Sequence, residues 1–255
     1  MSKLADRLRS LSESSGAPIG FHPARREASS PSMLFVVGLS GAHVKEATTV
    51  SDVAADAGLI ESEGTDARAI KQVVEAAGDA PIGVLVKRVR DKELDELVSL
   101  GCDFVVFDIG EEAAILSEKR IGKFLMTEPS LDQGLVRAIN SFEVDGVLIG
   151  DGDSVITVER LLVSRRFVEL LEKPVIMRLP ALVTKGELAS LWQGGVDGVV
   201  SASKHSTEGL TELKKMLGGL PRRTRNARPT AGVMLPRHGA GMVDEEDGHE
   251  EESQS

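Results

Sequence analysis

The stretch GCDFVVFD, residues 101–108, is an unbroken apolar run with Gly-x-Asp in front of it and a carboxylate at its far end. Its outline returns in VDGVLIGD at residues 144–151 and in VDGVVS at residues 196–201. Short runs that are apolar throughout are typical of strands in a parallel sheet, because such strands are buried on both faces. The three copies therefore indicate equivalent buried strands within one repetitive fold.

Short apolar runs alternate with helical segments from residue 33 onward. Capping-box patterns mark the start of two helical segments, at Ser130-x-x-Gln133 and at Thr184-x-x-Glu187. Strand and helix in alternation, eight times, predict a parallel (β/α)8 barrel. A doubly wound open sheet is the competing arrangement, because sequence order alone does not show closure. The strands are predicted at residues 33–39, 58–62, 82–87, 103–108, 123–127, 144–149, 174–178 and 196–201.

The length of 255 residues suits one barrel domain with short extensions. Residues 1–32 are expected to form an N-terminal helix, with Leu4, Leu8 and Leu11 on one stripe, and an extended connection. Residues 33–220 form the predicted barrel. Residues 221–255 carry an Arg-rich part and then an acidic part without any sustained period, and we expect this tail to be mostly disordered.

The amino-acid composition limits the kinds of protein that this chain can be. Hydrophobic residues make up 41% of the chain and aromatic ones only 3%, so aliphatic side chains must fill the core. The single cysteine, Cys102, is interpreted as a buried small hydrophobe, with a reactive thiol as the alternative. No apolar run is long enough for a membrane span and no export signal is recognised, so a cytoplasmic location and no membrane partner are expected. The net charge of −10 argues against nucleic acid as a partner.

The second half of the sequence resembles the phosphate-binding, aldolase-type TIM barrels, including the ribulose-phosphate-binding group and its relatives in the tryptophan pathway. The resemblance rests on PVIMR at residues 174–178, the capped helix that follows, and GGVDGVVS at residues 194–201. It is strongest over the fourth to eighth predicted strands and matches no specific family. It implies a TIM-barrel fold whose active face lies at the C-terminal ends of the strands.

Phosphate-binding members of this superfamily use glycines after the seventh and eighth strands, so that backbone N–H groups can approach a phosphate. Here these positions read RLPA at residues 178–181 and SASKHS at residues 201–206, without glycine. A modified anion site could use the hydroxyls of Ser201, Ser203 and Ser206 with the charges of Lys204 and Arg178. The alternative is a Ser-rich loop that caps the last helix.

Two catalytic patterns of the superfamily do not transfer to this chain. The decarboxylase and hexulose-phosphate synthase branch carries Asp-x-Lys-x-x-Asp on its third strand, and here Leu85 stands in place of the leading Asp before Lys87. Schiff-base aldolases usually place their lysine on strand six, where this chain has IGD at residues 149–151. The reaction therefore has to be inferred from the polar residues at the strand ends.

These strand ends are rich in ionisable groups, which can shift each other's pKa values when they converge in one mouth. We predict Lys87, Asp108 and Glu61 as catalytic residues. Lys87 would act as a proton donor, an electrostatic stabiliser or an imine-forming amine, and the alternative is a lysine that reaches solvent beside a carboxylate. The predicted substrate-binding residues are Glu128, Asp151, Arg178, Ser201 and Ser203.

The carboxylates at the strand ends allow a second hypothesis. Glu61, Asp108, Glu128 and Asp151 could bind Mg²⁺, which needs few protein carboxylates, and the alternative is that they cap helices. No metal ligand is assigned on this basis, and the cofactor stays open.

Two functional classes follow. The first is an enzyme, a lyase or isomerase that acts on a small, anionic, oxygen-rich metabolite by acid–base chemistry. The second is a non-catalytic barrel that serves as a binding or assembly module, with the tail contacting a partner. A homo-oligomer is compatible with both.

Overall fold

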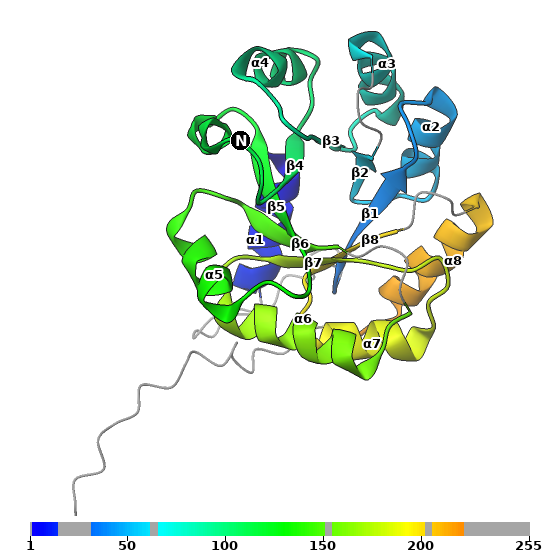
Figure 1. The fold of residues 1–255 in the computed structure, drawn as a ribbon. Coiled ribbons are helices and arrows are strands. Elements are labelled where there is room, and N and C mark those ends of the chain that lie inside the picture. Colours follow the sequence, from blue (N-terminus) through cyan, green and yellow to red (C-terminus); the bar gives the residue numbers. More distant parts are fainter. Residues whose placement is uncertain (1, 15–31, 62–65, 151–154, 202–205, 222–255) are drawn as a thin grey trace, which may run out of the picture.

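The computed structural model of the protein describes residues 2–14, 32–61, 66–150, 155–201 and 206–221. Eight parallel strands close into a barrel in the order β1 to β8, with β8 paired to β1 (Figure 1). The predicted (β/α)8 barrel is confirmed, and the open sheet is excluded by this pairing. The strands are β1 (Leu34–Leu39), β2 (Ala57–Ile60), β3 (Ile82–Leu85), β4 (Phe104–Asp108), β5 (Gly122–Thr127), β6 (Gly146–Ile149), β7 (Val175–Arg178) and β8 (Gly198–Val200).

Helices surround the barrel and cover its outer face (Figure 1). A short 3-10 helix, η1 (Ala113–Ser117), stands between β4 and β5 in place of an α-helix, and a second one, η2 (Ile139–Ser141), follows α5. None of the helices in the described part of the chain is long and apolar enough to cross a membrane. The α-helices are α1 (Lys3–Ser14), α2 (Val44–Asp52), α3 (Ala67–Ala77), α4 (Asp91–Ser99), α5 (Gln133–Ala138), α6 (Val158–Leu170), α7 (Lys185–Gly194) and α8 (Thr207–Gly218).

The capping signals read from the sequence are confirmed in one case and wrong in another. Thr184 accepts from the backbone N–H of Glu187, and the Glu187 carboxylate accepts from the Thr184 backbone N–H, as a capping box requires. Ser130 does not cap α5. The cap is Asp132, whose carboxylate accepts from the Gly134 N–H at 2.7 Å, so this helix begins later than the pattern predicted.

Successive side chains along each strand point alternately into the barrel and outward, so the buried apolar residues form two separate cores. Side chains such as Leu34, Leu59 and Phe104 fill the barrel interior, and the intervening ones pack outward against the helices. Phe104 and Phe124 meet edge to face inside, with ring centroids 5.4 Å apart. Phe104 fills the space beside Gly83, where a Cβ atom would lie 2.2 Å from its ring. The interior is therefore a packed core.

Helix α1 closes the N-terminal end of the barrel. Leu4 and Leu8 are buried in the same cluster as the interior strand residues. The carboxylate of Asp103, just before β4, accepts hydrogen bonds from the Lys3 N–H at 2.7 Å, the Leu4 N–H at 3.1 Å and the Ser2 hydroxyl at 2.7 Å. Asp103 therefore caps α1 from outside the helix, and the N-terminal helix predicted from the leucine spacing is confirmed.

An aspartate precedes each even-numbered strand at this same end. Asp56, Asp145 and Asp197 each donate their backbone N–H to a carbonyl at the start of the preceding strand, at 2.7 to 2.8 Å. Each carboxylate also accepts the N–H of that same residue, at 2.9 to 3.0 Å. Asp103 makes the backbone contact to Ile82 but turns its carboxylate to α1. We call the first three residues the aspartate clamps.

Cys102 lies beside this end of the barrel and is buried. Burial raises the pKa of its thiol to about 12, with the Asp103 charge adding to the effect. The thiol is therefore protonated at neutral pH, and the interpretation of Cys102 as a small buried hydrophobe is confirmed.

Candidate functional site at the barrel mouth

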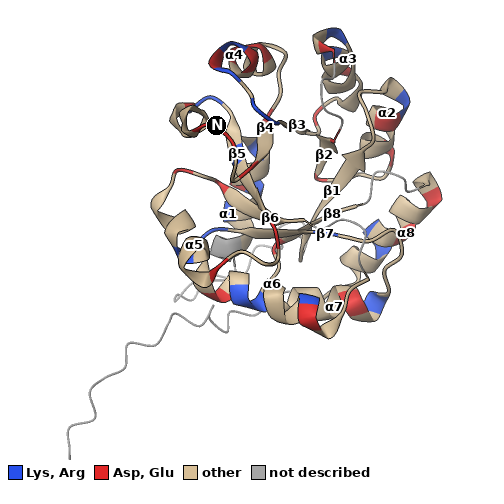
Figure 2. Ribbon diagram, in the orientation of Figure 1, with Lys and Arg blue, Asp and Glu red and all other residues tan. Residues whose placement is uncertain are grey.

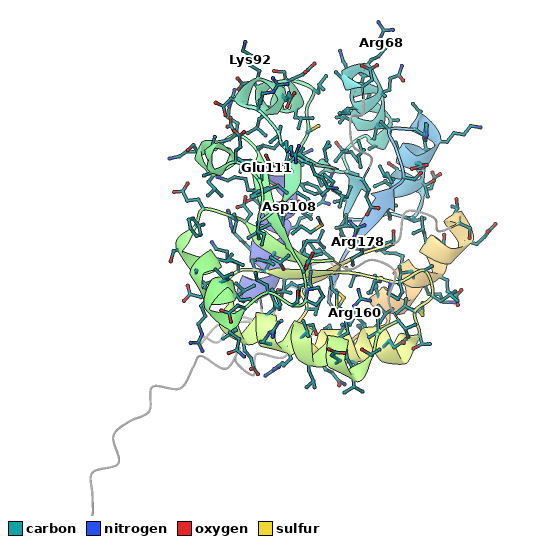
Figure 3. The ribbon with its side chains drawn as sticks, in the orientation of Figure 1. Arg68, Lys92, Asp108, Glu111, Arg160 and Arg178 are labelled. Atoms are coloured by element: carbon teal, nitrogen blue, oxygen red, sulfur yellow. The ribbon has the colours of Figure 1, made fainter. Side chains whose placement is uncertain are left out.

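The C-terminal ends of the strands bring polar side chains to the open mouth of the barrel. Ala57 and Leu59 of β2 face the interior, and Glu61 continues that inward series. Asp108 follows Phe104 and Val106 in the same way. Arg178 ends β7, two residues after the inward-facing Ile176. Figure 3 shows Asp108 and Arg178 toward the centre of the ring of strands.

Glu61 and Arg178 form an ion pair across the mouth. Nη1 of Arg178 lies 2.9 Å from Oε1 of Glu61, and the side chains are 16% and 12% exposed, respectively. The contact has the distance of an ion pair without the alignment of a hydrogen bond. Since β2 and β7 are separated by β1 and β8, the pair connects strands that are not neighbours in the sheet.

The Arg178 side chain extends over the end of β6. A Cβ atom added to Gly150 would lie 3.9 Å from Nε of Arg178 and 3.5 Å from Sδ of Met126. Met126 and Leu85 are half-buried and pack on the interior cluster. The Arg178 side chain therefore lies near Gly150 at the end of β6, and its guanidinium meets the Glu61 carboxylate.

A buried arginine that was not predicted from the sequence holds the backbone of Arg178. Arg160, in the first turn of α6, is 5% exposed and donates from Nη2 to the backbone carbonyl of Arg178 at 2.7 Å. A cation in the first turn of a helix is opposed by the helix dipole. That unfavourable placement is a signal that could have pointed to Arg160.

Asp108 is half-buried, and its Oδ1 accepts from the Gly110 N–H at 2.7 Å. Lys87 lies two residues beyond the end of β3, in a bend, and is exposed, although the sequence predicted it as the last residue of the strand. Arg88, next to it, has a left-handed φ of 53°. The Glu111 carboxylate accepts the N–H groups of Arg88 and Val89, at 2.6 and 2.9 Å, and so joins the loops after β3 and β4.

Known structures share this architecture. No protein-family model matches the sequence, and no curated protein matches it. Tryptophan synthase from M. tuberculosis, in its aminoacrylate-bound form, superposes with a TM-score of 0.58 and 16% identity over 86% of this chain and 97% of that one. The alpha subunit of tryptophan synthase from Pyrococcus furiosus gives 0.56 and 14% over 73% and 96%. A protein from Aquifex aeolicus gives 0.60 and 14% over 88% and 100%.

The protein has a TIM-barrel fold. The resemblance to aldolase-type TIM barrels read from its sequence is confirmed at the level of the fold. The sequence identities are too low to transfer a reaction, since one fold supports many chemistries.

Two of the other predicted binding residues of this TIM barrel make contacts with residues outside the ion pair. Ser201 is fully buried, and its Oγ accepts the Gly38 N–H at 3.1 Å, which ties β8 to β1. Glu128 is exposed and accepts from the Ser130 hydroxyl at 3.3 Å. Asp151 and Ser203 lie outside the described residues. The structure thus brings Glu61 and Arg178 into contact and places Asp108 at the C-terminal end of β4, on the same side of the barrel.

Within the described part of the chain, no group of three or more His, Cys, Asp or Glu side chains is arranged to hold a metal ion. Of the carboxylates considered for Mg²⁺, Glu61 is paired with Arg178, and Asp108 is bonded to a backbone N–H. These described residues do not fit a magnesium site, and Asp151 lies outside them.

Charge is distributed differently inside and outside the barrel. Figure 2 shows Lys, Arg, Asp and Glu of both signs spread over the surrounding helices, whereas the strands are mostly uncharged. The paired charges of Glu61 and Arg178 are therefore set into a largely apolar frame, where electrostatic interactions are stronger than on the surface.

Proposed function

We propose that the barrel mouth binds a small, anionic, oxygen-rich metabolite and that the protein is a TIM-barrel enzyme of the lyase or isomerase class. The observation that carries the proposal is the partly buried Arg178, held at the inward-facing end of β7 beside Glu61. A guanidinium is a suitable donor for a carboxylate or phosphate, because its N–H groups match two oxygens of the anion.

In this proposal Arg178 binds the anionic group of the metabolite. Asp108 or Glu61 removes a proton from the bound molecule, since carboxylates in partly desolvated sites serve as general bases. Lys87 returns a proton or stabilises the developing negative charge from the loop after β3. The remaining predicted contacts, Glu128, Asp151, Ser201 and Ser203, would orient the ligand or shape the loops around it.

The experiment is a thermal-shift screen of the purified protein against 2-oxo acids, hydroxy acids and sugar phosphates, followed by NMR detection of product. D108N tests the acid–base role, because an Asn oxygen can still accept the Gly110 N–H while the charge is removed. We expect D108N and K87M to retain the fold and ligand binding but lose turnover. Normal turnover in both variants would remove these two residues from the mechanism.

The second candidate is a non-catalytic barrel that binds a partner through the Arg-rich residues 221–239 and the acidic residues 243–255. The opposed charges of these two segments are the observation that favours it. Removal of residues 222–255 separates the candidates. An enzyme keeps its ligand binding after truncation, whereas an assembly module, including a homo-oligomer formed through the tail, loses its partner in size-exclusion chromatography.

A further inference from the structure

We propose that Glu61 is an internal competitor for the ligand. Its carboxylate occupies the position that the carboxylate of a small monocarboxylic acid takes on Arg178, and the ligand must displace it to bind. This inference rests on the proposed function, because it specifies the class of anion and the way in which the anion enters.

Arg178 is the fixed member of the pair. Its backbone carbonyl accepts from the buried Arg160, its strand is paired on both sides, and its side chain lies over Gly150 beside Met126. Glu61 lies one residue beyond the end of β2, and only its backbone N–H continues the strand pairing, to the Leu39 carbonyl at 3.0 Å. In the proposed exchange of partners, the Glu61 side chain moves and the backbone of Arg178 stays in place.

The existing contact is suited to exchange. The 2.9 Å approach of Glu61 Oε1 to Arg178 Nη1 lacks hydrogen-bond alignment, so this contact is weaker than an aligned arginine–carboxylate hydrogen bond. A free carboxylate is not constrained by a protein backbone and can align with two N–H groups. Its gain in alignment favours the ligand over the side chain.

The charge balance favours a single carboxylate. Glu61 contributes one negative charge to a site that is largely removed from water, with exposed fractions of 12% and 16% for the two partners. Replacement of the Glu61 carboxylate by another monoanion keeps the charge of Arg178 balanced, whereas a phosphate dianion leaves one excess negative charge that is costly to bury. The half-buried Leu85 and Met126 at the same mouth provide apolar contact for a short side chain. A branched 2-oxo acid combines these features.

Two substitutions break the same ion pair and have opposite expected effects. E61Q removes the competing charge, so 3-methyl-2-oxobutanoate should bind about tenfold more tightly than to the unmodified protein, because the acid no longer has to break an ion pair in order to bind. R178Q removes the ligand's partner and should abolish binding. E61D keeps the charge on a shorter side chain and should give an intermediate affinity.

The measurement is isothermal titration calorimetry with 3-methyl-2-oxobutanoate, pyruvate and inorganic phosphate, with circular dichroism as a check of folding. We expect the order of affinity to be 3-methyl-2-oxobutanoate, then pyruvate, then phosphate, in both the unmodified protein and E61Q. E61Q should also regain thermal stability when the acid is added, because the acid restores a partner to Arg178.

If the unmodified protein binds the acid and E61Q binds it with equal or lower affinity, Glu61 is not a competitor for the ligand. The proposed function would still stand. Unchanged binding by both E61Q and R178Q would show that the pair is only structural. A failure of all three probes on every variant would overturn the monocarboxylate assignment. The proposed function itself falls only if the wider screen of anionic metabolites also finds no ligand.

Discussion

At the scale of single residues, Gly83 is the position where the barrel interior has least room. Phe104 is 2% exposed, and its ring lies where a Cβ atom on Gly83 would be placed, at 2.2 Å. We expect G83A to lower the free energy of unfolding by about 1–3 kcal/mol, because overpacking forces a buried ring to move. Urea denaturation provides the measurement. The control is G218A in α8, where a Cβ atom meets nothing within 4 Å and no loss is expected.

Glu118 is the residue whose ionisation should make stability depend on pH. Hydrogen bonds from the Arg120 side chain, and then from its backbone, lower the pKa of Glu118 from 4.5 to about 2. A carboxylate with a lowered pKa in the folded state contributes stability above pH 4.5, and this contribution is lost as the pH falls from 4.5 toward 2. Arg120 also contacts Asp95 of α4, so the cluster joins α4 to the segment after η1.

We therefore expect the unmodified protein to lose more unfolding free energy than E118Q when the pH is lowered from about 5 to about 3. Urea denaturation at both pH values measures the difference. E112Q, which changes an exposed carboxylate in the same region, should behave like the unmodified protein. If E118Q and the unmodified protein lose stability equally, the Arg120 contacts do not contribute to folding in solution.

At the scale of secondary-structure elements, the start of α1 is stabilised by a residue that is distant in the sequence, Asp103. Asp103 accepts hydrogen bonds from Ser2, the residue before this helix, and from the N–H groups of Lys3 and Leu4 in its first turn. We expect D103A to destabilise the protein by about 1–2 kcal/mol, as loss of a helix cap does. Hydrogen exchange should show faster exchange in residues 3–11 than in β4. D79A, at an exposed aspartate, is the control, and equal protection of α1 in both variants would contradict the capping role.

Most elements could be predicted from the sequence because their signals are local. Buried parallel strands are apolar throughout, so each of the eight predicted strands differs from the observed one by at most two residues at either end. The strand predicted to end at Lys87, for example, stops at Leu85. The cap of α5 was misplaced because Ser130 and Asp132 both suit an N-cap, and the choice between them depends on the preceding loop. Closure itself was inferred from the count of strands, since pairing of β1 with β8 has no local signal.

The candidate site was less predictable than the fold. Glu61, Asp108 and Arg178 could be placed at the mouth because strand ends and alternation are visible in the sequence. Their partners could not, because the Glu61–Arg178 contact joins residues 117 positions apart on strands that are not adjacent. The buried state of Ser201 and its bond to Gly38 depend on the same closure. Arg160 was missed since one arginine in a charged helix looks like a surface residue until its burial is known.

At the scale of the whole molecule, the closed barrel should tolerate loss of the tail but not of its last strand. We expect a chain ending at residue 221 to keep the melting temperature of the full protein, because β1 to β8 and α1 to α8 all lie within it. A chain ending at residue 195 lacks β8 and leaves the edges of β1 and β7 unpaired, so it should aggregate. Scanning fluorimetry and light scattering compare the two. A soluble monomer ending at residue 195 would contradict this view of closure.

The aspartate clamps have a consequence at the opposite end of the barrel. Asp56 binds both the N–H and the carbonyl of Phe35 and thereby fixes the register of β2 against β1. Asp197 binds the same two groups of Val175 and fixes the register of β8 against β7. In a strand, a slip of one residue exchanges the inward and outward side chains. Such a slip in β2 would turn Glu61 toward the helices, and one in β7 would remove Arg178 from the mouth. Residues at the far end of the barrel thus determine, by odd and even count along the chain, which side chains reach the mouth.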